Sequence, residues 1–154
     1  MGFYQLKRQI ELKTDIDEIW KFISNPSNLK LITPDYMGFD ITSGDLPGNI
    51  YEGLIISYLV APVAGIKTRW VTEITHVKTK EYFVDEQRVG PYRMWHHQHF
   101  ISQVKNGTLM TDIVSYQPPF AIIGSLANRI IISRKLDEIF DYRTSVLSDL
   151  FGIV

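Results

Sequence analysis

The chain has 154 residues, with 16 basic and 17 acidic side chains, a formal net charge of -1 and no cysteine. This length fits one domain, and the balanced charge excludes the basic field with which proteins bind nucleic acid or anionic lipid. Disulfide frameworks and thiolate catalysis are also excluded, and no apolar run approaches the roughly 20 residues of a membrane-spanning helix. We therefore expect a single domain, residues 1–154, of a cytoplasmic protein without integral membrane association.

The first half of the chain combines strand and helix patterns. Thr14 or Asp15 offers an N-cap for a short helix over residues 16–23, and Asn25-Pro26-Ser27 ends that helix and begins a second short one. On either side of these helices, alternating polar and apolar residues bounded by glycine and proline turns predict strands. These strands cover residues 3–13, 39–43, 50–60 and 66–77.

Residues 82–116 predict three further antiparallel strands whose pairing follows from their turns. We place one turn near residues 90–92 and the other at Asn106-Gly107, the dipeptide best suited to a two-residue turn with positive φ at both positions. Directly opposed residues share a face of the sheet. The two turns predict the pairs Phe83–His99, Asp85–His97, Gln87–Trp95, His97–Tyr116, His99–Val114 and Ile101–Asp112.

One face of these three strands mixes large apolar groups with acids and histidines. Such a face is unlike a dry core, and a ligand cavity needs this composition: apolar walls with a few polar groups that orient the ligand. The face comprises Phe83, Asp85, Gln87, Trp95, His97, His99, Ile101, Met110, Asp112, Val114 and Tyr116. The opposite, solvent-facing side comprises Glu86, Arg88, His96, Gln98, Ser102 and Thr111.

After Pro118-Pro119 the apolar period changes from two to about 3.6, which predicts one long helix within residues 120–151. The apolar stripe of this helix comprises Ile132, Leu136, Ile139, Phe140, Leu147 and Leu150. The expected fold class is α+β: a seven-stranded antiparallel sheet that curls around the long C-terminal helix, with two short helices after the first strand. A gap between sheet and helix becomes a cavity.

This order of elements resembles the START-like, helix-grip superfamily, also called SRPBCC, over nearly the whole chain. The motifs GPYRMWHH (90–97), GTLMTD (107–112), LANR (126–129) and IFDYR (139–143) resemble a bacterial branch labelled polyketide cyclase/dehydrase or cell-division inhibition. Gln98, Phe100 and Ile113 depart from the pattern of that branch, where an acid and two arginines are usual. The resemblance implies a cavity that binds a hydrophobic ligand between the sheet and the C-terminal helix.

We therefore expect a small apolar or amphipathic molecule as the partner, bound without chemistry and without a cofactor or metal. The residues expected to contact it are Trp70, Gln87, Trp95, His97, His99, Asp112, Val114, Tyr116, Phe140 and Arg143. Arg143 lies on the apolar stripe of the helix. An arginine there more often reaches water, and the alternative is that it faces the cavity and binds a carboxylate of Asp85, of Asp112 or of a ligand.

Other functions remain open at this point. Asp85, His97 and Tyr116 suit a cyclase or dehydratase acting on a polyketide-like substrate, because an acid can orient an imidazole that moves a proton. His97 and His99 have a spacing used for zinc or iron when Asp85 or Asp112 converges on them. A third alternative is an interaction module with a vestigial cavity. We expect the loop 58–65 to form either a lip over the cavity mouth or the contact surface of a homodimer.

Overall fold

The computed structural model describes residues 2–61, 65–118 and 125–154, the last segment with side chains from residue 130 onward. Its elements match the expected α+β class: one strand, short helices, six strands and one long helix. In chain order they are β1 (Tyr4–Leu12), α1 (Ile16–Ile23), η1 (Pro26–Lys30), η2 (Asp35–Met37), β2 (Asp40–Ile41), β3 (Ile55–Val60), β4 (Thr68–Lys78), β5 (Tyr82–Val89), β6 (Met94–Val104), β7 (Gly107–Gln117) and α2 (Ser125–Phe151).

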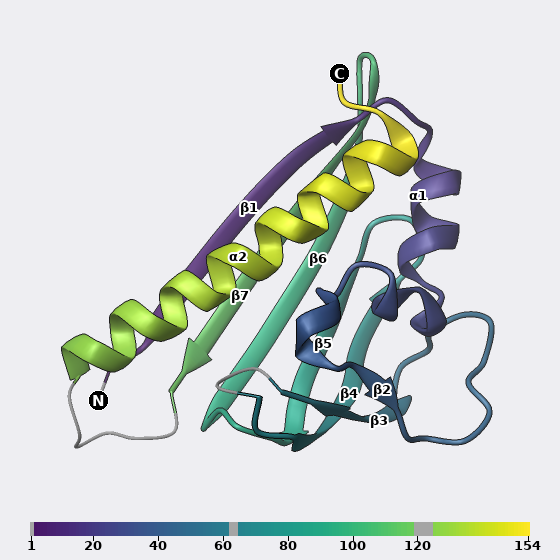
Figure 1. Ribbon diagram of the computed structural model, residues 1–154. Helices are drawn as coiled ribbons and strands as arrows, with labels where there is room; N and C mark the ends of the chain where they lie inside the picture. Colours follow the sequence, from purple (N-terminus) through teal and green to yellow (C-terminus); the bar gives the residue numbers. More distant parts are fainter. Residues whose placement is uncertain (1, 62–64, 119–124) are drawn as a thin grey trace.

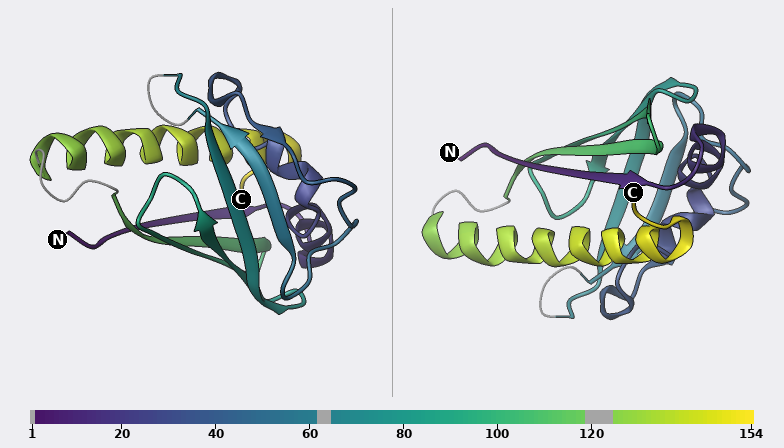
Figure 2. Two further views of the ribbon diagram at one scale, coloured as in Figure 1. Left: turned by 90° about the horizontal axis from the view of Figure 1, so that it is seen from below. Right: turned by 90° about the horizontal axis from the view of Figure 1, so that it is seen from above.

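The seven strands form one antiparallel sheet in the order β1-β7-β6-β5-β4-β3-β2. The sheet curves, and α2 runs diagonally across its concave face, while α1 lies close to the C-terminal end of α2 (Figure 1). Views along two further directions show α2 as a layer separate from the strands (Figure 2). A curved sheet and a straight helix cannot touch along their whole length, so side chains and a cavity fill the space between them.

Both helices are held at defined ends. The N-cap of α1 is Asp15, whose carboxylate accepts the backbone N–H of Glu18 at 2.8 Å. α2 ends at Gly152, whose φ of +71° is a left-handed conformation that glycine adopts without strain. The backbone N–H of Lys13 donates to the carbonyl of Gly152 at 3.1 Å, so the end of α2 is tied to the end of β1.

The first predicted register is correct and the second is wrong by two residues. Phe83 pairs with His99 and Asp85 with His97 as predicted, although the ladder between β5 and β6 ends at Glu86 before reaching Gln87. Between β6 and β7 the turn residues are Lys105 and Asn106. The pairs are Trp95–Tyr116, His97–Val114, His99–Asp112 and Ile101–Met110.

The physical reason for this shift lies at Gly107. Gly107 belongs to β7, pairs with Val104 and is absent from the described residues with positive φ, so the predicted positive-φ turn is not formed. A Cβ atom at residue 107 would overlap the backbone carbonyl oxygen of Leu12. Glycine is needed here because the end of β1 passes very close, not because the turn requires it. A shift of two residues keeps the parity of the strand, so the predicted inner face is correct.

One face of α2 is buried against the sheet. Leu136, Phe140 and Leu147 are fully buried, and Arg143 is buried on the same face with 8% of its surface exposed. Leu150 was predicted on this apolar stripe, but it is 53% exposed because the helix ends one turn beyond the sheet contact of Leu147. Within the described residues, no helix has both the length and the apolar composition needed to cross a membrane. The predicted lip at residues 58–65 lies partly outside the described residues, which omit 62–64.

Candidate functional site

A cavity of about 160 Å³ lies between the sheet, the short helices and α2. This is close to the volume of an engineered apolar cavity, about 150 Å³, that holds one benzene molecule. Most of the wall is aliphatic or aromatic: Phe22, Ile23, Leu29, Ile32, Met37, Phe39, Ile50, Ile56, Tyr58, Val60, Trp70, Ile74, Phe83, Tyr92, Trp95, Met110, Leu136, Ile139 and Phe140. The polar part includes Thr72, Asp85, His97, His99 and Arg143.

Two histidines of β6 and two carboxylates of the neighbouring strands form a closed ring of polar contacts in this wall. Nε2 of His97 lies 3.0 Å from Oδ1 of Asp112, and Nδ1 of His97 lies 3.5 Å from Oδ2 of Asp85. Nε2 of His99 lies 2.9 Å from Oδ2 of Asp85, and Nδ1 of His99 lies 2.8 Å from Oδ1 of Asp112. Each histidine thus bridges β5 and β7, and we call these four residues the polar ring.

The pKa values of the two histidines shift in opposite directions. Burial, together with the neighbouring His99, lowers the pKa of His97 to about 4 against the opposing effect of Asp112 and Asp85. Burial also acts to lower the pKa of His99, but the contacts with Asp112 and Asp85 outweigh it and raise that pKa. Near neutral pH, His97 is neutral, and its single N–H belongs to Nε2, which makes the shorter contact with Asp112.

The carboxylates of the polar ring are ionised. Burial by itself raises the pKa of Asp112 and of Asp85, yet contacts with the two histidines hold both pKa values below the ordinary range. When His99 is protonated, the charges of Asp85, Asp112, His99 and Arg143 sum to zero. A buried group of charges persists when it is compensated in this way.

Arg143 contacts the polar ring from α2. Its Nη1 atom lies 3.7 Å from Oδ1 of Asp112, and its guanidinium lies over the ring of Phe140, with Cζ 4.7 Å from the ring centroid. The more common outcome for an arginine on an apolar stripe, a side chain that reaches water, is therefore wrong here. Among the described residues, Nε and Nη1 of Arg143 make no hydrogen bond. A buried donor without a partner costs roughly 1–3 kcal/mol.

Six of the predicted ligand contacts lie on the cavity wall: Trp70, Trp95, His97, His99, Phe140 and Arg143. The structure places the other four elsewhere. Gln87 holds the turn between β5 and β6 through the backbone of Tyr92, whose N–H it accepts at 3.1 Å and to whose carbonyl it donates at 2.6 Å. Asp112 lies behind the histidines, and Val114 is fully buried in the contact with α2.

Tyr116 pairs with Trp95 rather than with His97, because of the two-residue shift between β6 and β7. Its ring packs against Tyr4, Tyr92 and Trp95. Of the trio predicted for catalysis, the structure brings Asp85 and His97 together at 3.5 Å and places Tyr116 two residue pairs farther along the hairpin.

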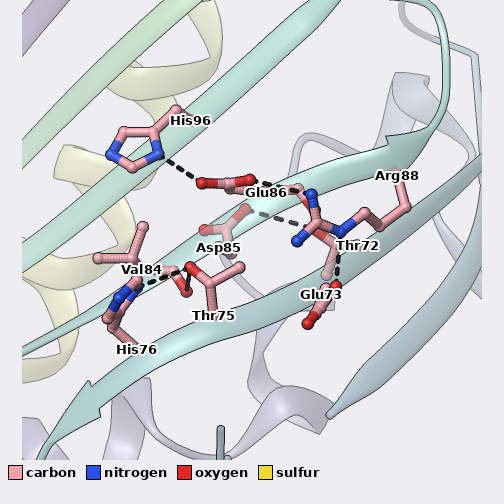
Figure 3. A network of polar contacts seen from close by, with 9 residues as sticks. All are labelled: Thr72, Glu73, Thr75, His76, Val84, Asp85, Glu86, Arg88 and His96. Carbon is pink, nitrogen blue, oxygen red and sulfur yellow. Dashed lines mark hydrogen bonds and ion pairs between the residues drawn. The ribbon is translucent and has the colours of Figure 1, made fainter. Parts of the chain in front are cut away.

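Several wall residues were not predicted from the sequence. Tyr58 and Tyr92 pack on Trp70, with ring centroids 6.0 and 5.7 Å away, and form an aromatic part of the wall together with Trp95. Tyr58 could have been found from the alternation of β3, where it shares parity with Ile56 and Val60. Tyr92 lies in a turn, where alternation gives no signal. Thr72 is not among these unpredicted residues, because the parity that it shares with Trp70 on β4 predicts a place beside Asp85 on the cavity wall or in the core; its hydroxyl donates to Oδ1 of Asp85 at 3.4 Å (Figure 3).

The opposite face of the sheet has a separate set of contacts. Glu86 accepts from His96 at 2.9 Å and from Arg88 at 3.0 Å, and Arg88 also contacts Glu73 of β4 at 2.5 Å (Figure 3). These groups are exposed or half-buried, so each ion pair contributes about 0–1 kcal/mol. Thr111 was predicted to face solvent, but Gln9 of β1 covers it and donates to its hydroxyl at 3.0 Å.

Asp85, His97 and His99 each offer one ligand atom to a metal ion, and these atoms lie within 4.8 Å of one another. Two neutral imidazoles and a carboxylate would suit zinc or non-haem iron. Two features oppose a cation there. The raised pKa of His99 means that a metal must displace a proton, and the positive charge of Arg143 lies against the same ring.

Solved structures with the same arrangement of elements identify the fold. Protein CV1439 from Chromobacterium violaceum superposes with a TM-score of 0.69 at 13% identity over 100% of both chains. A START superfamily protein from Mycobacterium smegmatis gives a TM-score of 0.69 at 10% identity over 97% of this chain and 99% of its own. This chain has the helix-grip fold of START-like proteins.

The same fold is found in Ara h 8.0201, which superposes with a TM-score of 0.62 at 11% identity over 96% of this chain and 99% of that one. No protein-family model matches the chain, and no curated protein is similar to it in sequence. At sequence identities this low, the similarity to START-like proteins concerns the fold alone. The function must therefore be argued from the residues of the cavity.

Proposed function

We propose that residues 1–154 act as one START-like domain that binds a small, largely apolar molecule between the sheet and α2. The observation that carries this proposal is the cavity of about 160 Å³, whose wall is mainly aliphatic and aromatic but includes the polar ring. Apolar walls supply affinity through burial, and a few fixed polar groups orient the ligand. The fold shared with a START superfamily protein supports the same proposal.

A cyclase or dehydratase acting on a polyketide-like substrate is the second candidate, favoured by the contact between Asp85 and His97 on the cavity wall. A general base works best when its pKa lies near the operating pH. The pKa of His97, about 4, makes it a weak base at neutral pH, so binding ranks before catalysis. If the protein is a cyclase, Asp85→Asn should abolish turnover and leave ligand affinity nearly unchanged.

The binding proposal can be tested with the neutral fluorescent probe 1-naphthylamine, whose two fused rings are compatible with a cavity of about 160 Å³. We expect its emission to rise on addition of the wild-type protein, and a cavity-filling variant, Ile139→Trp, to weaken the interaction at least tenfold. Ile139 lies on the cavity wall and is half-buried, so the larger side chain enters the cavity without displacing the core. Ile131→Trp on the same helix is the matched control, because Ile131 is 51% exposed and lies outside the cavity.

Equal affinity of the probe for wild type and Ile139→Trp would mean that this cavity is not the binding site. Native mass spectrometry of protein purified from its own host gives an independent measurement, since a co-purifying mass identifies the class of ligand directly.

A further inference from the structure

The buried polar atoms that lack a hydrogen bond have one property in common. Within the described part of the chain, the buried side-chain nitrogens and oxygens that lack a hydrogen bond are Nε1 of Trp70 and Nε and Nη1 of Arg143. All three are donors, and both residues lie on the cavity wall. Buried polar groups in folded proteins are nearly always paired, with protein or with a bound molecule. Donors without a hydrogen bond in two residues that line the same cavity therefore point to a ligand that accepts hydrogen bonds.

The net charge of the site indicates whether the accepting group of the ligand is anionic or neutral. Asp85 and Asp112 lie in or behind the same wall, and Asp112 is 3.7 Å from Nη1 of Arg143. With two carboxylates and Arg143, the site has a net charge of -1 when both histidines are neutral and zero when one is protonated. In neither state does the site have an excess positive charge, so a buried ligand carboxylate would be left uncompensated.

We propose that the ligand is an uncharged, mainly apolar molecule with carbonyl oxygens, a ketone, ester or amide, that accepts hydrogen bonds from Arg143 and Trp70. This inference rests on the proposed function and names the chemical class of its ligand. Each carbonyl oxygen has two lone pairs and no charge, so carbonyl oxygens can accept from these donors and leave the charge balance of the polar ring unchanged. Arg143 is 8% exposed and Trp70 is 7% exposed, so water competes poorly with such an acceptor.

Three probes of matched shape separate the possibilities: phenylbutanone, with a carbonyl group, phenylpropanoate, with a carboxylate, and isopentylbenzene, with neither. Each consists of one ring and a short chain, a size suited to a cavity of about 160 Å³. By calorimetry at neutral pH we expect phenylbutanone to bind at least tenfold more tightly than either of the others. Tighter binding of phenylpropanoate, or equal binding of the hydrocarbon, would overturn the inference.

Substitutions then show which side chains donate hydrogen bonds to the ligand. Arg143→Met should reduce the preference for phenylbutanone over isopentylbenzene about tenfold, and Trp70→Phe should reduce it by a smaller factor. Arg134→Met and Trp20→Phe are the matched controls, because Arg134 is exposed and neither residue lies on the cavity wall. An unchanged preference in both Arg143→Met and Trp70→Phe would contradict the proposal.

A spectroscopic measurement on the wild type keeps the test independent of how well Arg143→Met folds. The infrared C=O stretch of isotope-labelled phenylbutanone should move to lower frequency on binding, because donors in the wall weaken the bond; a stretch unchanged from that in an apolar solvent would contradict the proposal. If 1-naphthylamine binds but phenylbutanone does not, the carbonyl inference fails and the proposed function stands. If neither binds, the proposed function fails.

Discussion

His97 and His99 lie on the same face of β6 with ring centroids 3.7 Å apart, yet their pKa values shift in opposite directions. His99 lies within 2.9 Å of both carboxylates of the polar ring, and its ring stacks on Phe83. His97 has only one short contact, with Asp112. Two positive charges this close would repel each other, so the proton is held by the histidine with the better partners.

The first prediction concerns these protonation states. In nitrogen-15 NMR titrations of the histidine rings, His97 should stay neutral down to a pKa of about 4, while His99 should titrate above the ordinary histidine value. A pKa of His99 below 6 would contradict this distribution of charge in the polar ring.

The second prediction is a pH dependence of stability that belongs to His97. The ordinary histidine pKa of 6.5 applies to the unfolded chain, and the pKa of folded His97 is about 4, so the unfolded chain binds more protons between these values. Stability should therefore fall as pH falls through this window, by on the order of 3 kcal/mol. His99 has the opposite sign: its contribution is complete below its unfolded pKa and is lost as pH rises through its raised folded pKa.

Urea denaturation of wild type and His97→Gln at pH 7 and pH 4.5 measures this effect. Glutamine keeps a donor for Asp112 but does not titrate in this range, so the variant should lose less free energy of unfolding between the two pH values. The same loss in both proteins would show that His97 is not the group responsible.

The third prediction concerns the carboxylate behind the histidines. Asp112→Asn removes the negative charge that lies near His97, His99 and Arg143, and should lower the free energy of unfolding by about 3–5 kcal/mol. The pKa of His99 should fall in the same variant. Asp141→Asn on the exposed side of α2 is the matched control and should change stability by less than about 0.5 kcal/mol. Comparable effects of the two substitutions would contradict a role for Asp112 in balancing the buried charges.

The fourth prediction compares two leucines of α2. Leu147 is 1% exposed and packs with Leu12, Ile19 and Met110, so Leu147→Ala should cost about 2–5 kcal/mol through lost burial and a new cavity. Leu150→Ala, at a position that is 53% exposed, should cost much less. Thermal or urea denaturation measures both effects. A larger loss of stability for Leu150→Ala than for Leu147→Ala would mean that α2 packs a different face against the sheet.

The fifth prediction concerns the close approach at Gly107. Gly107→Ala should destabilise the protein by about 1–3 kcal/mol, because the new methyl group meets the carbonyl oxygen of Leu12. Gly44→Ala is the matched control: the added Cβ would have no described atom within 4 Å and its φ is not positive, so stability should be unchanged or slightly higher. A neutral Gly107→Ala substitution would mean that β1 does not pass so close to the hairpin.

The sequence determined the features that depend on local pattern. Alternation with a period of two assigns side chains to one face or the other, and this parity survives a shift of two residues. His97, His99 and Asp112 were therefore correctly predicted to face inward, although the pairs across β6 and β7 were wrong. The cap at Asp15 and the change of period before α2 likewise act within a few residues, and the elements they predict are present.

Only the tertiary structure decided which inward-facing groups reach the cavity. The β6–β7 register depends on the backbone of Leu12, nearly a hundred positions away in the sequence, because it passes against Gly107. The burial of Arg143 depends on where α2 crosses the sheet, and the unpaired donors of Arg143 and Trp70 come from elements far apart in the sequence, α2 and β4. Helical and strand periodicity specify a face, whereas a cavity is defined by the distance between faces, which long-range packing sets.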